Sequence, residues 1–422
     1  MMMRKILTCI ILVIVSLLSG ITPNIEGIMK KSETELADLD IELKNLDENM
    51  QNIFDGSTVK NETVMFLEKG EAKDLLFKID KILSVTSYDG EITYVEGVDY
   101  ALKGGQIVCL EGSSVPCITN EVFYNCEDSV ISVNHDGKIV PMYWGEGTAM
   151  TRWQVNVTYT HSDVWNGYRQ KCSADTLSPF INKLIKGEDV TVMFYGDSIT
   201  FGANASSIIG TKPYQMPYTV LFTKALADLF GYNIHFINTN LPKAATVPDD
   251  YDKGSSHTIT YINPSVGGWS TEDGIENYDT YVKPFIEEYG CDLFMLGFGM
   301  NDGGLAPRKY CRNEKKILNS VIRQTPGVNL LLMATMVPNP DGIGWYGNQI
   351  YQEEVLIDCS DKYNKAGVPC AVIGMSSTSL SVLEHKQFRD YTGNNINHPN
   401  DFFSRIYAQV MLQCVIGYEN MK

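Results

Sequence analysis

The sequence has few histidines and no cysteine–histidine spacing of the kind that binds zinc. It contains 6 histidines and 10 cysteines, and no CxxC motif. Structural zinc sites are built from closely spaced Cys and His pairs, so we predict no metal site and no bound cofactor. Without Cys9 the number of cysteines is odd, which argues against a complete disulfide framework. We expect mostly buried free thiols, with one bridge at most among Cys109, Cys117 and Cys126.

A second long apolar run is also missing from the sequence. The one such run, residues 6–18, follows Arg4 and Lys5 and is shorter than the roughly 20 residues of a membrane span. This pattern predicts a signal peptide at residues 1–20 and a secreted or extracytoplasmic protein, although an uncleaved anchor stays open. We expect no other membrane contact. Residues 21–51 are polar and acidic, which is typical of a linker or a surface helix.

Positive charge is outnumbered by negative charge. The formal net charge is −17, and an acidic chain repels phosphate backbones, so nucleic acid is excluded as an expected partner. We interpret the charge as a solubility feature. With 422 residues, of which 44% are hydrophobic, the chain is long enough for two domains.

Residues 52–175 have the texture of a small β domain. Short β-rich runs alternate with turn pairs, among them Asp89-Gly90 and Asp136-Gly137. This spacing predicts a β-sandwich, and Asp136-Gly137 between strand-like residues predicts a hairpin. We expect the strands at 63–67, 78–85, 92–95, 106–110, 130–133, 138–143 and 154–159.

Residues 176–422 alternate between strand-like and helix-like segments. We expect strands at 190–195, 233–238, 292–298, 329–337 and 368–374, and helices at 217–230, 281–289, 308–324, 349–365 and 401–415. Continuous apolar strands between helices indicate a parallel sheet covered on both faces. In such α/β domains the functional site lies at the carboxyl ends of the strands.

Ser198 stands directly after the first of these strands, in the segment Gly196-Asp197-Ser198. A serine there is placed for nucleophilic catalysis, but it needs an adjacent base. The segment is not GxSxG, so the α/β-hydrolase elbow does not apply. Taken alone, Gly-Asp-Ser is better explained as a turn or a helix N-cap.

Two further segments follow strand ends. Gly267-Gly268 could bring backbone N–H groups close to a bound group, and Asn301 after the third strand could direct an amide at a developing oxyanion. Taken alone, a plain glycine turn explains Gly267-Gly268 better, and an Asn-Asp-Gly turn explains the Asn301 segment equally well. His398 is the histidine in a polar loop beyond the last strand, and imidazole is the natural base for a serine near neutral pH.

Together, these blocks resemble the SGNH hydrolase family, also called GDSL-like esterases. That family has a Gly-Asp-Ser strand end, a glycine loop, a Gly-x-Asn-Asp strand end and a His-Pro pair. The matching residues here are Gly196-Asp197-Ser198, Gly268, Gly299-Met300-Asn301-Asp302 and His398-Pro399. The resemblance covers roughly residues 185–420. It implies a flavodoxin-like three-layer α/β fold and a metal-free esterase or acetylesterase.

The resemblance also implies roles for these residues. Ser198 would attack the ester carbonyl and His398 would take its proton, while the N–H groups of Ser198 and Gly268 and the side chain of Asn301 would bind the oxyanion. One position departs from the family. Where an aspartate usually stands three residues before the histidine, this chain has Asn395. A Ser–His dyad, with the imidazole oriented by an amide or a backbone carbonyl, is our preferred interpretation, and a carboxylate from another loop is the alternative.

Asp197, Trp269 and Trp345 are the residues that we expect to contact substrate, the two tryptophans as walls of the cleft. A β-sandwich before such a domain is similar to some carbohydrate esterases, which implies an acetylated carbohydrate or another small ester as substrate. Three alternatives stay open: an acyltransferase acting on sugar hydroxyls, a lipase-like esterase for longer acyl chains, and a non-catalytic carbohydrate-binding relative.

Overall fold

The computed structural model describes residue 50 and residues 52–417. The expected signal peptide at 1–20 lies outside the described residues, as does the linker at 21–51 apart from Met50. Within the described part of the chain, every helix is too short or too polar to cross a membrane.

The larger part of the molecule is built on a six-stranded parallel sheet with the order β10-β11-β9-β12-β13-β14. The strands are β9 (Val190–Gly196), β10 (Asn233–Ile237), β11 (Thr258–Ile262), β12 (Leu293–Gly297), β13 (Asn329–Ala334) and β14 (Cys370–Gly374). Alternate residues of β9 belong to different cores, because Val192 and Phe194 pack into one hydrophobic cluster and Met193 and Tyr195 into another. Both faces of the sheet are therefore covered, as continuous apolar strands require.

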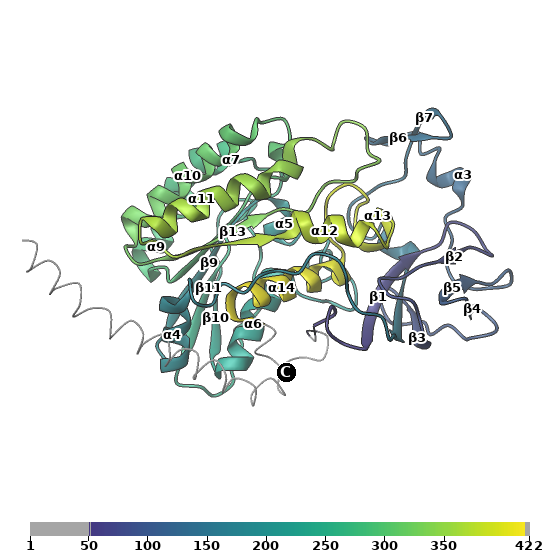
Figure 1. Ribbon diagram of the computed structural model, residues 1–422, viewed down its shortest axis with the longest axis horizontal. Coiled ribbons are helices and arrows are strands. Elements are labelled where there is room, and N and C mark those ends of the chain that lie inside the picture. The colour runs from purple at the N-terminus through teal and green to yellow at the C-terminus, as the bar shows by residue number, and fades with distance from the viewer. Residues whose placement is uncertain (1–49, 51, 418–422) are drawn as a thin grey trace, which may run out of the picture.

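Helices cover the two faces and complete three layers (Figure 1). α6 (Tyr218–Phe230) and α14 (Asp401–Ile416) pack on one face, and α9 (Lys283–Tyr289), α10 (Pro307–Gln324) and α11 (Gln352–Lys365) pack on the other. α6 ends at Gly231, which has φ 75°, a conformation that suits glycine. The remaining helices of this part are α4 (Ser178–Lys186), α5 (Ser198–Phe201), α7 (Thr271–Glu276), α8 (Tyr278–Tyr281), α12 (Met375–Leu383) and α13 (Phe388–Tyr391).

Strand β11 was not among the expected strands. Its sequence Thr-Ile-Thr-Tyr-Ile is short and lies between polar loops, yet it pairs in parallel with both β10 and β9. The chain thus places β10 and β11 on one side of β9 and β12 on the other. Such a reversal of strand order opens a crevice at the carboxyl ends of the strands. The sequence motifs converge at the ends of β9, β11 and β12.

The preceding part of the chain, residues 52–175, forms small antiparallel sheets. β1 (Thr58–Met65), β8 (Gln154–Thr160) and β3 (Lys81–Ser87) make one sheet, and β2 (Ala72–Lys73), β5 (Gln106–Cys109) and β4 (Tyr100–Lys103) make another. Most of their buried apolar side chains belong to one hydrophobic cluster. β6 (Ser132–His135) and β7 (Lys138–Pro141) form the expected hairpin, in which Asp136 has φ 51° and Gly137 has φ 77°. The expected strand at 92–95 is only a bridge, Thr86 to Thr93. We call residues 52–175 the β region and residues 176–417 the α/β region.

Buried ion pairs join the two regions. Lys386, before α13, places its Nζ 2.6 Å from a carboxylate oxygen of Glu62 on β1, and both side chains are 0% exposed. Lys73 on β2 lies 3.1 Å from Asp390 on α13. Asp390 also accepts the backbone N–H of Met65. Charged groups are buried only where they are paired, so these ion pairs hold the two regions against each other.

Candidate active site

Ser198 begins α5 immediately beyond the carboxyl end of β9. Asp197 is the N-cap of this short helix, and its Oδ1 accepts the N–H of Ile199 at 3.0 Å. Ser198 is only 7% exposed. The first N–H groups of a helix have no partner within the helix, so the N–H of Ser198 is available to a bound oxygen.

Asp197, which we expected to contact substrate, is buried beneath the site instead. Its second oxygen accepts the N–H of Met300 at 3.2 Å, so this carboxylate ties the end of β9 to the loop after β12. Burial raises the pKa of Asp197 to about 7, although its backbone hydrogen bonds act in the opposite direction. The residue braces the site, and its 1% exposure leaves no face for a substrate.

The glycine loop and Asn301 follow the ends of the strands on either side of β9. A Cβ added to Gly267 would stand 3.7 Å from the Cβ of Ser198, and Gly268 has φ +82° with open space around its missing side chain. Asn301 Nδ2 donates to the carbonyl oxygen of Trp269 at 2.8 Å. An amide nitrogen carries two hydrogens, so this bond fixes the amide and leaves one donor for another acceptor.

His398 completes the contact that the sequence predicted. Its Nε2 lies 2.9 Å from Ser198 Oγ, and its exposed fraction is 8%. The loop that carries it is held by Asn394, whose Oδ1 accepts the N–H groups of Ile396, Asn397 and His398, each at 3.0 Å. Helix α14 follows, and its N-cap is Asn400. The Oδ1 of Asp401 accepts the N–H of Ser206.

Two residues that sequence reasoning missed contact the other nitrogen of this imidazole. His398 Nδ1 lies 2.8 Å from Asn204 Oδ1 and 3.1 Å from Glu146 Oε2. Asn204 follows α5 in the α/β region, whereas Glu146 belongs to the β region. Asn204 has φ 66°, which is unusual for a residue other than glycine and marks a constrained position.

Asn395, at the position where the family usually has aspartate, points elsewhere. Its Nδ2 donates to Tyr143 O at 2.9 Å and its Oδ1 accepts from Asn339 Nδ2 at 3.3 Å. Both ends of the amide therefore face away from His398. The amide and the carboxylate that we weighed for orienting the ring both stand at Nδ1, as Asn204 and Glu146.

The two tryptophans that we expected near the substrate differ in their surroundings. Trp269 is partly buried, with its ring 4.7 Å from that of Tyr281. Trp345 is 36% exposed on a loop held at both ends by the segments that carry the candidate catalytic groups. At one end Asn339 Nδ2 donates to Asn395 O at 2.8 Å, and at the other Gln349 Nε2 donates to Met300 O at 3.0 Å. The loop that carries Trp345 thus contacts both the histidine loop and the Asn301 loop.

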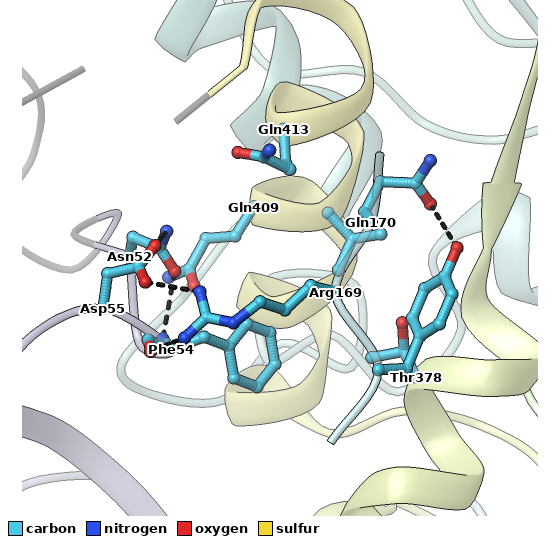
Figure 2. A pocket seen from close by; sticks show the side chains of 10 residues that line it. Asn52, Phe54, Asp55, Arg169, Gln170, Thr378, Gln409 and Gln413 are labelled. Atoms are coloured by element: carbon cyan, nitrogen blue, oxygen red, sulfur yellow. Dashed lines mark hydrogen bonds and ion pairs between the residues drawn. The ribbon is translucent and has the colours of Figure 1, made fainter. Parts of the chain in front are cut away.

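The pocket drawn in Figure 2 is a separate cavity of about 50 Å³. Asn52, Phe54 and Asp55 line it, together with the segment 168–170 and helices α12 and α14. Arg169 pairs there with Asp55 and donates to Phe54 O at 3.1 Å. A cavity of this size holds a few water molecules at most. It contains neither Ser198 nor His398, so it is not the site of the chemistry.

Chemically, the assembled residues can activate and stabilise an acyl transfer. Ser198 has a base within hydrogen-bonding distance, and the far nitrogen of that base faces two oxygen atoms. The Ser198 N–H, the glycine loop and the Asn301 amide stand at neighbouring strand ends, where donors for an oxyanion are needed. A nucleophile, an oriented base and candidate oxyanion donors are therefore all present.

No family model and no curated protein matches the sequence. Solved structures are similar over about half of the chain. A two-domain esterase (CEX) active on acetylated mannans, co-crystallised with mannopentaose, has a TM-score of 0.41 and 17% identity over 58% of this chain and 54% of that chain. An acetyl xylan esterase, AlAXEase, has a TM-score of 0.36 and 17% identity over 53% of this chain and 98% of that chain.

A lipase/acylhydrolase from Enterococcus faecalis has a TM-score of 0.34 and 15% identity over 53% of this chain and 94% of that chain. Of the two-domain esterase named first, this chain spans only about half of the length.

Proposed function

We propose that the chain is a serine esterase of the SGNH type, with Ser198 as nucleophile and His398 as general base. The observation that carries this proposal is the 2.9 Å contact between Ser198 Oγ and His398 Nε2, together with acceptors at His398 Nδ1. Because two oxygen atoms face Nδ1, we assign the hydrogen to that nitrogen, which leaves the lone pair of Nε2 for the serine hydroxyl.

The proposed reaction has two halves. Ser198 Oγ bonds to the acyl carbon while its proton moves to His398 Nε2, and the resulting oxyanion is stabilised by the Ser198 and Gly268 N–H groups and by Asn301. The ester C–O bond breaks as His398 returns the proton to the leaving alcohol. Water then attacks the acyl-enzyme with His398 again as base, which releases the acid and restores Ser198.

We propose a small acyl group, acetyl in the first instance, carried by a carbohydrate. Ser198 and His398 are 7% and 8% exposed, which suits a short acyl group better than a long chain in a broad apolar cleft. Trp345 and its neighbour Tyr346, 37% exposed, stand on the loop that contacts the histidine and Asn301 segments, and we propose that a sugar ring lies on them. The N-terminal sequence adds the expectation of export.

The test compares hydrolysis of the p-nitrophenyl esters of acetate, butyrate and octanoate by the wild type and Ser198→Ala. We expect turnover that is highest on acetate and is lost in the variant. Ser256→Ala is the matched control, because Ser256 Oγ also lies near a histidine, 3.2 Å from His257 Nε2, but on an exposed surface. Absence of turnover on every ester, or turnover that survives in Ser198→Ala, would contradict the proposal.

A further inference from the structure

Glu146 reaches the catalytic histidine from outside the region that carries every other candidate catalytic group. It stands between β7 and β8, in the segment Trp144-Gly145-Glu146-Gly147, where Gly147 has φ 66°. This conformation suits glycine, so the chain can turn sharply directly after Glu146. The turn brings Glu146 Oε2 to 3.1 Å from His398 Nδ1.

The neighbouring amide settles which nitrogen of His398 carries the hydrogen. Asn204 Nδ2 faces two carbonyl oxygens, those of Gly147 at 3.3 Å and Gly393 at 3.2 Å. Asn204 Oδ1 is therefore turned toward the imidazole as an acceptor, like Glu146 Oε2. Two acceptors at one nitrogen require that Nδ1 be the donor.

The carboxylate of Glu146 is held and ionised where it stands. Its other oxygen accepts from Asn394 Nδ2 at 2.9 Å. Burial alone would raise the pKa of Glu146, but its contacts with His398 and Asn394 outweigh burial and lower the pKa below its usual range. A negative charge therefore faces Nδ1 at neutral pH, although the side chain is 53% exposed and partly screened by solvent.

The histidine loop is itself anchored in the β region. Ile396 is buried in a hydrophobic cluster with β-region residues such as Ile131 and Met142. Asn395 Nδ2 donates to Tyr143 O at 2.9 Å. Contacts on both sides of His398 thus fix the distance between Glu146 and the imidazole, so their approach does not depend on one flexible side chain.

We propose that Glu146 is the positioning residue of His398, so that the β region supplies the acid of a Ser198–His398–Glu146 triad that the α/β region lacks. This inference rests on the proposed function. When His398 takes the proton of Ser198, the carboxylate of Glu146 stabilises the imidazolium. Asn204 keeps the imidazole ring in its orientation. No proton moves to Glu146, because an acid in this position stabilises the charge without taking the hydrogen.

Glu146→Gln tests this role because it keeps the shape of the side chain and removes its charge. We expect kcat on p-nitrophenyl acetate to fall roughly 10²-fold with KM nearly unchanged, less than the ~10⁴-fold of a buried triad aspartate, since Asn204 still accepts from Nδ1. The acid limb of the pH–rate profile should move to lower pH, because a carboxylate favours the protonated imidazole. The nearby buried carboxylates of Asp197 and Asp401 remain in the variant and cannot cause this shift.

A second readout requires no ester substrate. A fluorophosphonate probe modifies activated serines, and mass spectrometry follows its rate at Ser198 in the wild type, Glu146→Gln and Glu127→Gln. Glu127 is an exposed glutamate of the same region and serves as the matched control. We expect slow modification in Glu146→Gln alone, with thermal unfolding unchanged in all three proteins.

The outcomes separate the two proposals. Modification and turnover in Glu146→Gln at the wild-type rate would overturn the triad while leaving the Ser–His esterase intact. The triad would also be overturned if Glu146→Ala is slow but Glu146→Gln is not, because Glu146 would then only support the loop. Failure of the probe to modify Ser198 in the wild type would overturn the proposed function, and the triad with it.

Discussion

The α/β region and the β region contribute to the site in different ways. In the α/β region, Ser198, Gly268 and Asn301 follow the carboxyl ends of adjacent strands, so the hydrogen-bonded sheet itself sets their spacing. In the β region, Glu146 stands on a loop, and side-chain contacts with Asn394 and His398 set its position. The groups that follow strands, and His398 before the last helix, leave a sequence motif, whereas Glu146, which tertiary contacts place, leaves none.

Breaking the buried ion pair at the junction between the regions should have the largest effect on the free energy of unfolding. In Lys386→Met the carboxylate of Glu62 is left buried without its partner, and breaking such a pair costs about 3–5 kcal/mol of unfolding free energy. Urea unfolding measures it. Lys309→Met, which breaks the half-exposed pair with Glu272, is the control and should change little. An equally small change in Lys386→Met would mean that the junction is not held by this pair.

Asn301→Ala tests the α/β side alone. Removing one oxyanion donor typically lowers kcat about 10²–10³-fold, and we expect this loss without the shift of the acid limb predicted for Glu146→Gln. Steady-state kinetics over a pH series distinguishes the two variants. If Asn301→Ala retains the wild-type kcat, then its bond to Trp269 O is structural and the oxyanion is held by backbone groups only.

Asp197→Asn probes the buried carboxylate beneath the strand ends through the pH dependence of stability. Because the folded-state pKa of Asp197 is raised to about 7 from 3.8, the folded state binds more protons than the unfolded state between these values. Stability therefore falls as the pH rises from about 4 to about 7. The variant should lose this part of the pH dependence, as followed by thermal unfolding midpoints. An identical pH dependence in both proteins would contradict the raised pKa.

Much of the α/β region was predictable because its strands are continuous apolar runs and its helices have clear ends. The helix expected at 308–324 is α10 (Pro307–Gln324), and the one expected at 401–415 is α14 (Asp401–Ile416). β11 was missed because five residues between polar loops have too little pattern to distinguish them from a loop. In the β region the hairpin at Asp136-Gly137 was found because its turn chemistry is local.

The candidate site divides in the same way. The four motif blocks predicted which segments would meet, and Ser198 contacts His398 while the glycine loop and Asn301 stand at the neighbouring strand ends. The sequence could not indicate Glu146 or Asn204, since each acts through long-range contacts with His398. Its one hint was the missing aspartate at Asn395, which implied that another group must orient the imidazole. Glycines on both sides of Glu146 are too common a pattern to identify that group.

Trapping the acyl-enzyme would test the role of Ser198 without relying on any variant. The wild type is mixed with p-nitrophenyl acetate, quenched in acid within the first turnover, digested and examined by mass spectrometry. The proposed mechanism predicts one acetyl group on the peptide that contains Ser198, bound to that serine and absent after longer incubation without substrate. An acetyl group on another residue, or rapid turnover with no acetylated peptide at any time, would contradict it.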